Sequence, residues 1–230
     1  KRAIAAAPEE ALTWHELGLT YRALGRSADA VAAVSKAVEL DPDLPEARNN
    51  LGILWVAGGE QARAEPAFRE AIRIRPDYSD AHGNLANLLA GAGRFDEARD
   101  HFEIALRLQP GDAPTRYNYA MLLGRAGNFD EAQRELEASL RADPGFADAH
   151  QLLGDLLMAK ERAQEAVPHY REALRLKPES GRAQLGLGTA LAAVGDSTGA
   201  VEYLRKAVAS SDAATREQAA EMLRRLEKGK

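Results

Sequence analysis

Apolar residues recur along the chain at spacings of three and four positions, which is the periodicity of amphipathic helices and not of strands. The pattern repeats at a fixed interval, because the prolines at 42, 76, 110, 144 and 178 are each 34 residues apart. Counted from Ala11, position 8 of every interval is Gly or Ala and position 20 is Ala, whereas positions 7 and 24 are large and aliphatic or aromatic. Such an interval predicts a stack of units, each made of two antiparallel helices.

Within each unit, the small residues at positions 8 and 20 let the two helix axes approach closely, and the large residues pack around that contact. We expect the first helix to end near the glycines at 25, 59, 93, 127 and 195, where glycine can adopt the left-handed conformation that closes a helix. The fifth unit departs from this rule, because Lys160 and Glu161 occupy the place of the glycine.

The repeated residues resemble the tetratricopeptide-repeat family. The first unit carries almost the whole family pattern, in Trp14, Leu17, Gly18, Tyr21, Ala30, Val34 and Pro42. The resemblance implies an all-α fold, a right-handed α-α superhelical solenoid of TPR helix pairs. It predicts six consecutive 34-residue repeats over residues 11–214, at 11–44, 45–78, 79–112, 113–146, 147–180 and 181–214.

The two ends of the chain differ from the repeats. Residues 1–10 read as the remnant of a preceding repeat, its helix B, because Pro8 lies 34 residues before Pro42. We therefore expect the chain to be the C-terminal part of a longer protein. Residues 215–230 read as a C-terminal capping helix, with Ala219, Met222, Leu223 and Leu226 on one apolar stripe and charged residues elsewhere.

Composition excludes several classes of function. The 230 residues include 30 basic and 35 acidic side chains, for a net charge of −5, so a nucleic-acid partner is not expected. The absence of cysteine excludes disulfides and thiolate chemistry. No run is apolar enough for membrane insertion, so we expect a soluble protein, with the cytoplasm favoured slightly over the periplasm.

No residue pattern indicates catalysis, a metal site or a cofactor. The five histidines never occur four residues apart, and the chain has neither a phosphate-binding loop nor a nucleophile motif. His82 and His150 share position 4 of their units with Trp14, a helix-packing position, so a structural role is expected for both. We therefore predict that the protein is not an enzyme.

The family resemblance also implies a binding surface. In tetratricopeptide repeats, positions 2, 5, 6, 9, 12 and 13 of the first helix line a concave groove that faces a bound peptide. Transferred to this chain, these positions give a candidate peptide-binding set, which is Asn49, Asn50, Asn84, Asn87, Tyr117, Asn118 and Arg125. Amides donate and accept, so a column of them can pair with an extended backbone. The alternative is that asparagine is merely tolerated on a solvated helix face. Asp80 and Asp148 at position 2 favour a neutral or basic ligand.

Three functions fit these observations. The first is a non-catalytic scaffold that binds a protein or an extended peptide segment in the concave groove. The second is the substrate-recruiting region of a larger enzyme whose catalytic domain lies upstream. The third is a self-assembling module, in which the truncated N-terminal edge at Lys1 to Ala7 associates with another copy.

Overall fold

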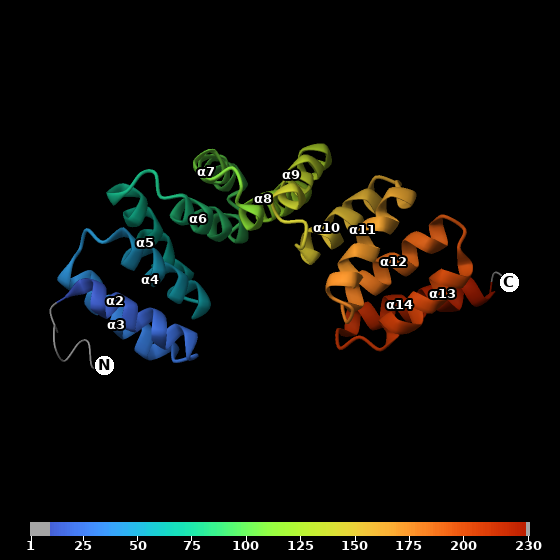
Figure 1. Cartoon of the computed structure of the whole chain (residues 1–230), viewed down its shortest axis with the longest axis horizontal. Coiled ribbons are helices and arrows are strands. Elements are labelled where there is room, and N and C mark those ends of the chain that lie inside the picture. The colour runs from blue at the N-terminus through green and yellow to red at the C-terminus, as the bar shows by residue number, and fades with distance from the viewer. Residues whose placement is uncertain (1–9, 229–230) are drawn as a thin grey trace. The chain divides into compact units, whose positions relative to one another are not determined.

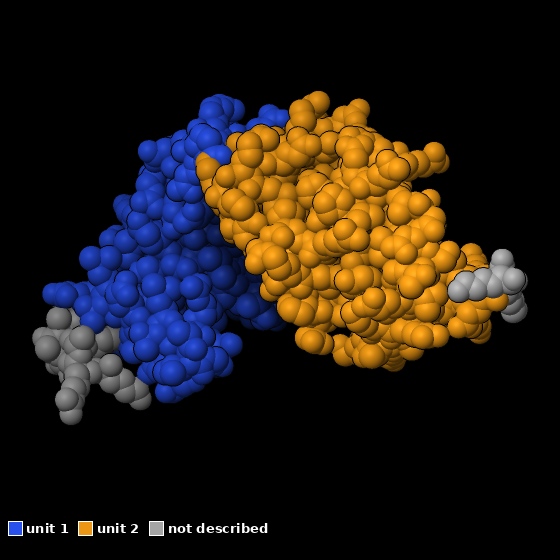
Figure 2. All heavy atoms as spheres, turned by 45° about the vertical axis from the view of Figure 1, so that its right-hand side comes forward, with its two compact units in different colours: residues 1–110 blue, residues 111–230 orange. Residues whose placement is uncertain are grey.

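The computed structural model describes residues 10–228, and within that span every regular element is an α-helix (Figure 1). The all-α prediction is confirmed. The chain forms two compact units, one ending at Pro110 and the other beginning at Gly111 (Figure 2). Unit 1 contains α2 (Ala11–Ala23), α3 (Ser27–Leu40), α4 (Pro45–Ala57), α5 (Gln61–Ile74), α6 (Ser79–Gly91) and α7 (Phe95–Leu108).

Unit 2 contains seven helices within the described residues. They are α8 (Ala113–Arg125), α9 (Phe129–Ala142), α10 (Ala147–Ala159), α11 (Ala163–Leu176), α12 (Gly181–Ala193), α13 (Ser197–Val208) and α14 (Ala213–Lys228). In both units each even-numbered helix up to α12 packs against the helix that follows it. Unit 1 thus holds three helix pairs, and unit 2 holds three pairs followed by α14.

The predicted contact between small and large residues forms the core of each pair. Alanines at position 20, such as Ala64 and Ala98, have no exposed surface, and the aromatic rings of Phe68 and Phe102 at position 24 are equally buried. A Cβ atom added to Gly52 would lie 2.6 Å from the Phe68 ring. A side chain at Gly52 would therefore force the Phe68 ring or the two helices of this pair to move.

The first helices end as the glycine pattern predicts. Gly25, Gly59, Gly93, Gly127 and Gly195 all have positive φ angles, between 71° and 88°. In the fifth repeat Glu161 adopts the same conformation, with φ at 60°, and is the one non-glycine residue in the described chain that does so. The flanking hydrogen bonds are kept, because Arg162 N–H donates to the Leu157 carbonyl at 2.9 Å. The backbone of Glu161 is therefore strained, because residues with a Cβ atom disfavour the left-handed conformation.

Replacing Glu161 with glycine is expected to raise the free energy of unfolding by up to about 1 kcal/mol, because relief of strain exceeds the added entropy of the unfolded chain. Chemical denaturation monitored by circular dichroism measures the change. Arg171→Gly in the exposed middle of α11 is the matched control and should cost about 1 kcal/mol. A loss of stability in Glu161→Gly would contradict the strain at this position.

The two chain ends are described to different extents. The proposed helix remnant at 1–10 lies outside the described residues except for Glu10, and the proposed self-association edge, Lys1 to Ala7, lies wholly outside them. At the other end, α14 buries Ala219 completely beside Leu204 and Ala207 of α13, and Met222, Leu223 and Leu226 pack against the same cluster. The apolar stripe expected on this helix therefore covers the last helix pair.

Candidate functional site

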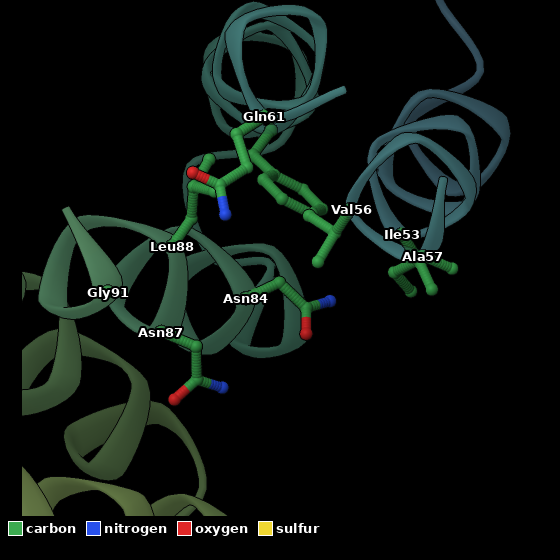
Figure 3. Close-up of a pocket in the computed structure, with 9 residues that line it drawn as sticks. Ile53, Val56, Ala57, Gln61, Asn84, Asn87, Leu88 and Gly91 are labelled. Atoms are coloured by element: carbon green, nitrogen blue, oxygen red, sulfur yellow. The ribbon is translucent and has the colours of Figure 1, made fainter. Parts of the chain in front are cut away.

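A cleft of about 370 Å³ opens in unit 1 between neighbouring helix pairs. We call it the unit 1 cleft. Its apolar wall comes from α4, from Leu88 of α6 and from the buried ring of Phe68, and its polar groups come from α6 and from Gln61 of α5. Figure 3 shows how the labelled residues surround it. Its lining residues are Ile53, Val56, Ala57, Gln61, Phe68, Asn84, Asn87, Leu88 and Gly91. Two of the seven residues predicted from the sequence, Asn84 and Asn87, therefore line a single concave feature.

Asn84 and Asn87 differ in how free their amides are. Asn84 Nδ2 donates to Asn49 Oδ1 at 3.0 Å, which fixes the side chain and leaves its own carbonyl oxygen without a hydrogen bond in the described structure. Asn87 is exposed, and its amide makes no hydrogen bond within residues 10–228. In Figure 3, Asn84 projects from α6 toward α4, and Asn87 projects from the same helix about one turn further along. Both amides are thus available to a ligand in the cleft.

Asn49 does not occupy the exposed position that the sequence assigned to it. Its side chain is only 3% exposed, and its Nδ2 lies 3.5 Å from the hydroxyl of Tyr78 while its Oδ1 accepts from Asn84. Burial of an amide requires such partners. Asn49 therefore positions Asn84 and does not itself reach the surface.

Asn50 is also engaged with its own chain. Its Nδ2 lies 2.8 Å from Nε2 of the buried His15, and its Oδ1 accepts from Arg22 at 3.3 Å. Burial lowers the pKa of His15, so a neutral ring accepts the amide proton. The amides of Asn50 and Asn84 at position 6 both bond to the position 5 residue of the preceding repeat. This inter-repeat bond is a structural role that sequence reasoning missed.

The other three predicted residues lie in unit 2. The Tyr117 ring packs against Phe146, with centroids 5.1 Å apart, and burial raises the pKa of its hydroxyl. Asn118 is half-buried, and its amide makes no hydrogen bond within the described residues. Arg125 is exposed and lines a second cleft, of about 300 Å³. These residues are described within unit 2 alone.

This second cleft, the unit 2 apolar cleft, corresponds to the unit 1 cleft position by position. Adding 68 to the number of each residue that lines the unit 1 cleft gives a residue that lines the second one. The corresponding residues are Met121, Gly124, Arg125, Phe129, Leu136, Leu152, Asp155, Leu156 and Ala159. Leu152 and Asp155 thus stand where unit 1 has Asn84 and Asn87. The same surface of the repeat forms a cleft in both units, with different chemistry.

A third cleft of about 490 Å³, the unit 2 polar cleft, is also lined by Asp155. Its lining includes Tyr170, Arg182, Gly186, Thr189 and Asp212. The Tyr170 hydroxyl donates to Asp155 Oδ1 at 2.7 Å, and Arg182 donates to Asp155 Oδ2 at 2.8 Å. Burial is the largest influence on Asp155 and raises the pKa of its carboxyl group. Sequence reasoning missed this cluster, although Asp155 stands at position 9, one of the groove positions.

In each unit, two histidines on the two helices of one pair lie within hydrogen-bond distance of each other. His82 Nδ1 lies 2.9 Å from His101 Nδ1, and His150 Nδ1 lies 3.2 Å from His169 Nδ1. His82 Nε2 donates to the Pro76 carbonyl at 3.1 Å, and His150 Nε2 donates to the Pro144 carbonyl at 3.2 Å. The structural role expected for His82 and His150 is therefore a hydrogen bond that holds the turn before the helix.

Comparison with known protein families identifies the repeats. Two family models, each described as tetratricopeptide repeat, match the chain, one at residues 89–156 and the other at residues 1–45, 15–79, 59–113 and 152–215. The chain belongs to the tetratricopeptide-repeat family. No curated protein matches it in sequence.

Solved structures of tetratricopeptide-repeat proteins share the fold. YrrB, described as a TPR protein with an unusual peptide-binding site, is 25% identical, with a TM-score of 0.61 over 79% of this chain and 94% of that chain. PilW, described as a widely conserved type IV pilus biogenesis factor, is 22% identical, with a TM-score of 0.81 over 93% and 98%. Pseudomonas aeruginosa pilF is 21% identical, with a TM-score of 0.82 over 92% and 97%.

Membership of this family supports a protein-interaction role, because tetratricopeptide repeats are generally non-catalytic binding scaffolds. Among residues 10–228, no cluster of three or more histidine, aspartate or glutamate side chains could hold a metal ion. None of the described helices is long and apolar enough to cross a membrane.

Proposed function

We propose that the chain is a non-catalytic scaffold that binds an extended segment of a partner protein along the first helices of its repeats. In unit 1 the contacts are made at the unit 1 cleft, with Asn84 and Asn87 as the groups that bind the partner backbone. The observation that carries the proposal is the pairing of these two amides with an apolar wall in one concave cleft.

The two amides suit an extended backbone. An asparagine side chain offers a carbonyl acceptor and two N–H donors, and a peptide unit presents one donor and one acceptor. Asn87 has all of these groups free of hydrogen bonds in the described structure, and Asn84 keeps its carbonyl and one N–H. Recognition through the backbone tolerates many partner sequences.

The apolar wall adds affinity without fixing the partner sequence. Val56 is 41% exposed and lies with Ile53 and Leu88 around the cleft. An aliphatic side chain of the partner would bury this surface. In unit 2 we propose Tyr117, Asn118 and Arg125 as further contacts. The peptide-binding site described for YrrB, at 25% identity, supports this class of ligand.

Peptides selected from a phage-displayed library of random linear sequences provide the test, since no partner is needed in advance. Replacing Asn87 with alanine is expected to weaken such a peptide by about 0.5–1.5 kcal/mol, the value of one neutral hydrogen bond, without changing the melting temperature. Asn84→Ala should give a similar loss, with some loss of stability because its bond to Asn49 disappears. Fluorescence anisotropy measures both affinities.

Asn128→Ala is the matched control, since Asn128 is exposed, lies outside the clefts and makes no side-chain capping bond. Its affinity should equal that of the unchanged chain. Selected peptides whose affinities are the same for Asn84→Ala, Asn87→Ala and the control would overturn the use of the unit 1 cleft. A library that yields no binding peptide would overturn the scaffold proposal itself.

A further inference from the structure

Asp155 occupies a singular place in unit 2, because its side chain lines both the apolar and the polar cleft. It extends from α10 at position 9 of its repeat and remains 27% exposed. Asn87, the equivalent residue in unit 1, carries no charge. The substitution of a carboxylate for an amide at this one register position changes what the surface can bind.

The carboxylate of Asp155 is held in place by a buried tyrosine. The Tyr170 ring comes from α11, is 1% exposed, and reaches the cleft between two glycines. A Cβ atom added to Gly154 would lie 2.8 Å from the ring, and one added to Gly186 would lie 2.4 Å from it. The hydroxyl then donates to Asp155 Oδ1 at 2.7 Å. Asp155 is therefore preorganised, with little conformational entropy left to lose on binding.

The ion pair with Arg182 uses only part of the hydrogen-bonding capacity of the Asp155 carboxylate. Arg182 is 67% exposed, so its pairing with Asp155 is screened by water and contributes little. A carboxylate offers about four acceptor positions, and the described structure uses one on each oxygen. A second cation can thus bind Asp155 directly.

The apolar cleft beside Asp155 fits the hydrocarbon part of a long cationic side chain. Leu152 and Leu156 flank Asp155 on α10, and Met121 and Phe129 are 42% and 41% exposed at the same cleft. Lysine and arginine bury their methylene stems on such surfaces while the charge reaches a polar group. A short acidic or polar side chain would leave these walls uncovered.

We propose that Asp155 binds a lysine or arginine side chain of the partner segment, whose aliphatic stem lies in the unit 2 apolar cleft. This inference rests on the proposed scaffold function and specifies its ligand, a basic residue within an extended chain. The Tyr170 hydroxyl acts as a positioning group for Asp155.

The experiment uses the full chain and the same random linear peptide library. Peptides selected on the unchanged chain should be enriched in lysine or arginine, and peptides selected on Asp155→Asn should not. A selected peptide should bind Asp155→Asn at least about tenfold more weakly, the expected loss for one charge-assisted contact. Glu172→Gln is the matched control, because Glu172 is an acidic residue of unit 2 that pairs with Arg175 on α11, outside both clefts and the groove positions. It should leave enrichment and affinity unchanged.

A change in the peptide tests the same contact without altering the fold of the protein. Replacing the basic residue with norleucine keeps the stem and removes the charge, so affinity for the unchanged chain should fall about tenfold. The same replacement should cost nothing further in Asp155→Asn. Selected peptides without an excess of basic residues, or a norleucine effect that persists in Asp155→Asn, would overturn this inference while the scaffold proposal stands. Only a library without any binding peptide would overturn both.

Discussion

Replacing Phe102 with alanine is expected to lower the free energy of unfolding by about 3–5 kcal/mol, one of the two largest effects predicted for this chain. The ring has no exposed surface and lies in the third helix pair with Leu85, Ala86 and Ala98, which are equally buried. Truncation removes the transfer energy of the ring and leaves a cavity that helices packed around alanines cannot easily close. Guanidinium titration followed by circular dichroism measures the loss.

Phe102→Leu is the control for this prediction. Leucine already occupies the equivalent position 24 in two other repeats, as Leu136 and Leu204, both fully buried. A change that nearly conserves volume should cost less than about 1.5 kcal/mol. Equal losses for the alanine and leucine variants would show that the ring shape, and not the filled volume, stabilises this helix pair.

The helices could be predicted closely from the sequence because their packing is local. Each helix buries its residues against the other helix of its repeat and against the neighbouring repeats. The positions of Ala98 and Phe102 therefore recur in every 34-residue repeat. Gly127 and its equivalents marked the helix ends through a conformation that glycine adopts most easily. Even Glu161 follows the repeat, because the hydrogen bonds around it outweigh its own preference.

The candidate site could be predicted only in part. The repeat position correctly indicated that Asn84 and Asn87 lie at a surface, where they line one cleft. It could not show that Asn49 is buried, because that depends on hydrogen bonds to Tyr78, the last residue of its own repeat, and to Asn84 of the next repeat. The position of a residue within its repeat does not give the distance of its side chain from the side chains of the neighbouring repeat.

Asp155 was missed for a related reason. The sequence prediction was based on a column of amides, and Asp155 has a carboxylate in place of the amide. Its place 68 residues after Asn87, at the same repeat position, could be read from the sequence. The bond from Tyr170 was not readable, because that ring reaches the cleft only between two glycines that lie on different helices, Gly154 and Gly186.

The stability of the chain is expected to fall as the pH drops from about 7 to about 5, because several histidines are held neutral in the fold. Burial lowers the pKa values of His15, His82, His101 and His169. In the unfolded chain a histidine binds its proton near pH 6.5, whereas the folded chain resists this until a lower pH. Each of these histidines therefore lowers the free energy of unfolding by up to about 1.4 kcal/mol per pH unit below about pH 6.5.

The geometry explains why His82 resists protonation. A carbonyl only accepts, so His82 Nε2 carries the proton that it donates to Pro76, and His82 Nδ1 must accept from His101. A further proton on His82 Nδ1 would place two donors face to face. The charged groups around His101 are Arg69, Asp100 and Glu97, and those around His169 are Glu137 and Glu165. The carboxylates raise the pKa values of these histidines and so partly offset the effect of burial, but they do not reverse it.

Unfolding free energies of the unchanged chain and of the variant His82→Gln, measured by guanidinium titration between about pH 7 and about pH 5, test this prediction. Glutamine is a natural replacement, because Gln184 stands at the same repeat position and its Nε2 donates to the Pro178 carbonyl at 2.9 Å. The variant keeps that donor but has no titrating group at position 82, so its stability should fall less steeply over this range. The ion-paired glutamates, whose pKa values are lowered, lose their charge only below this window. Equal slopes for the two proteins would show that His82 is not a source of the acid sensitivity.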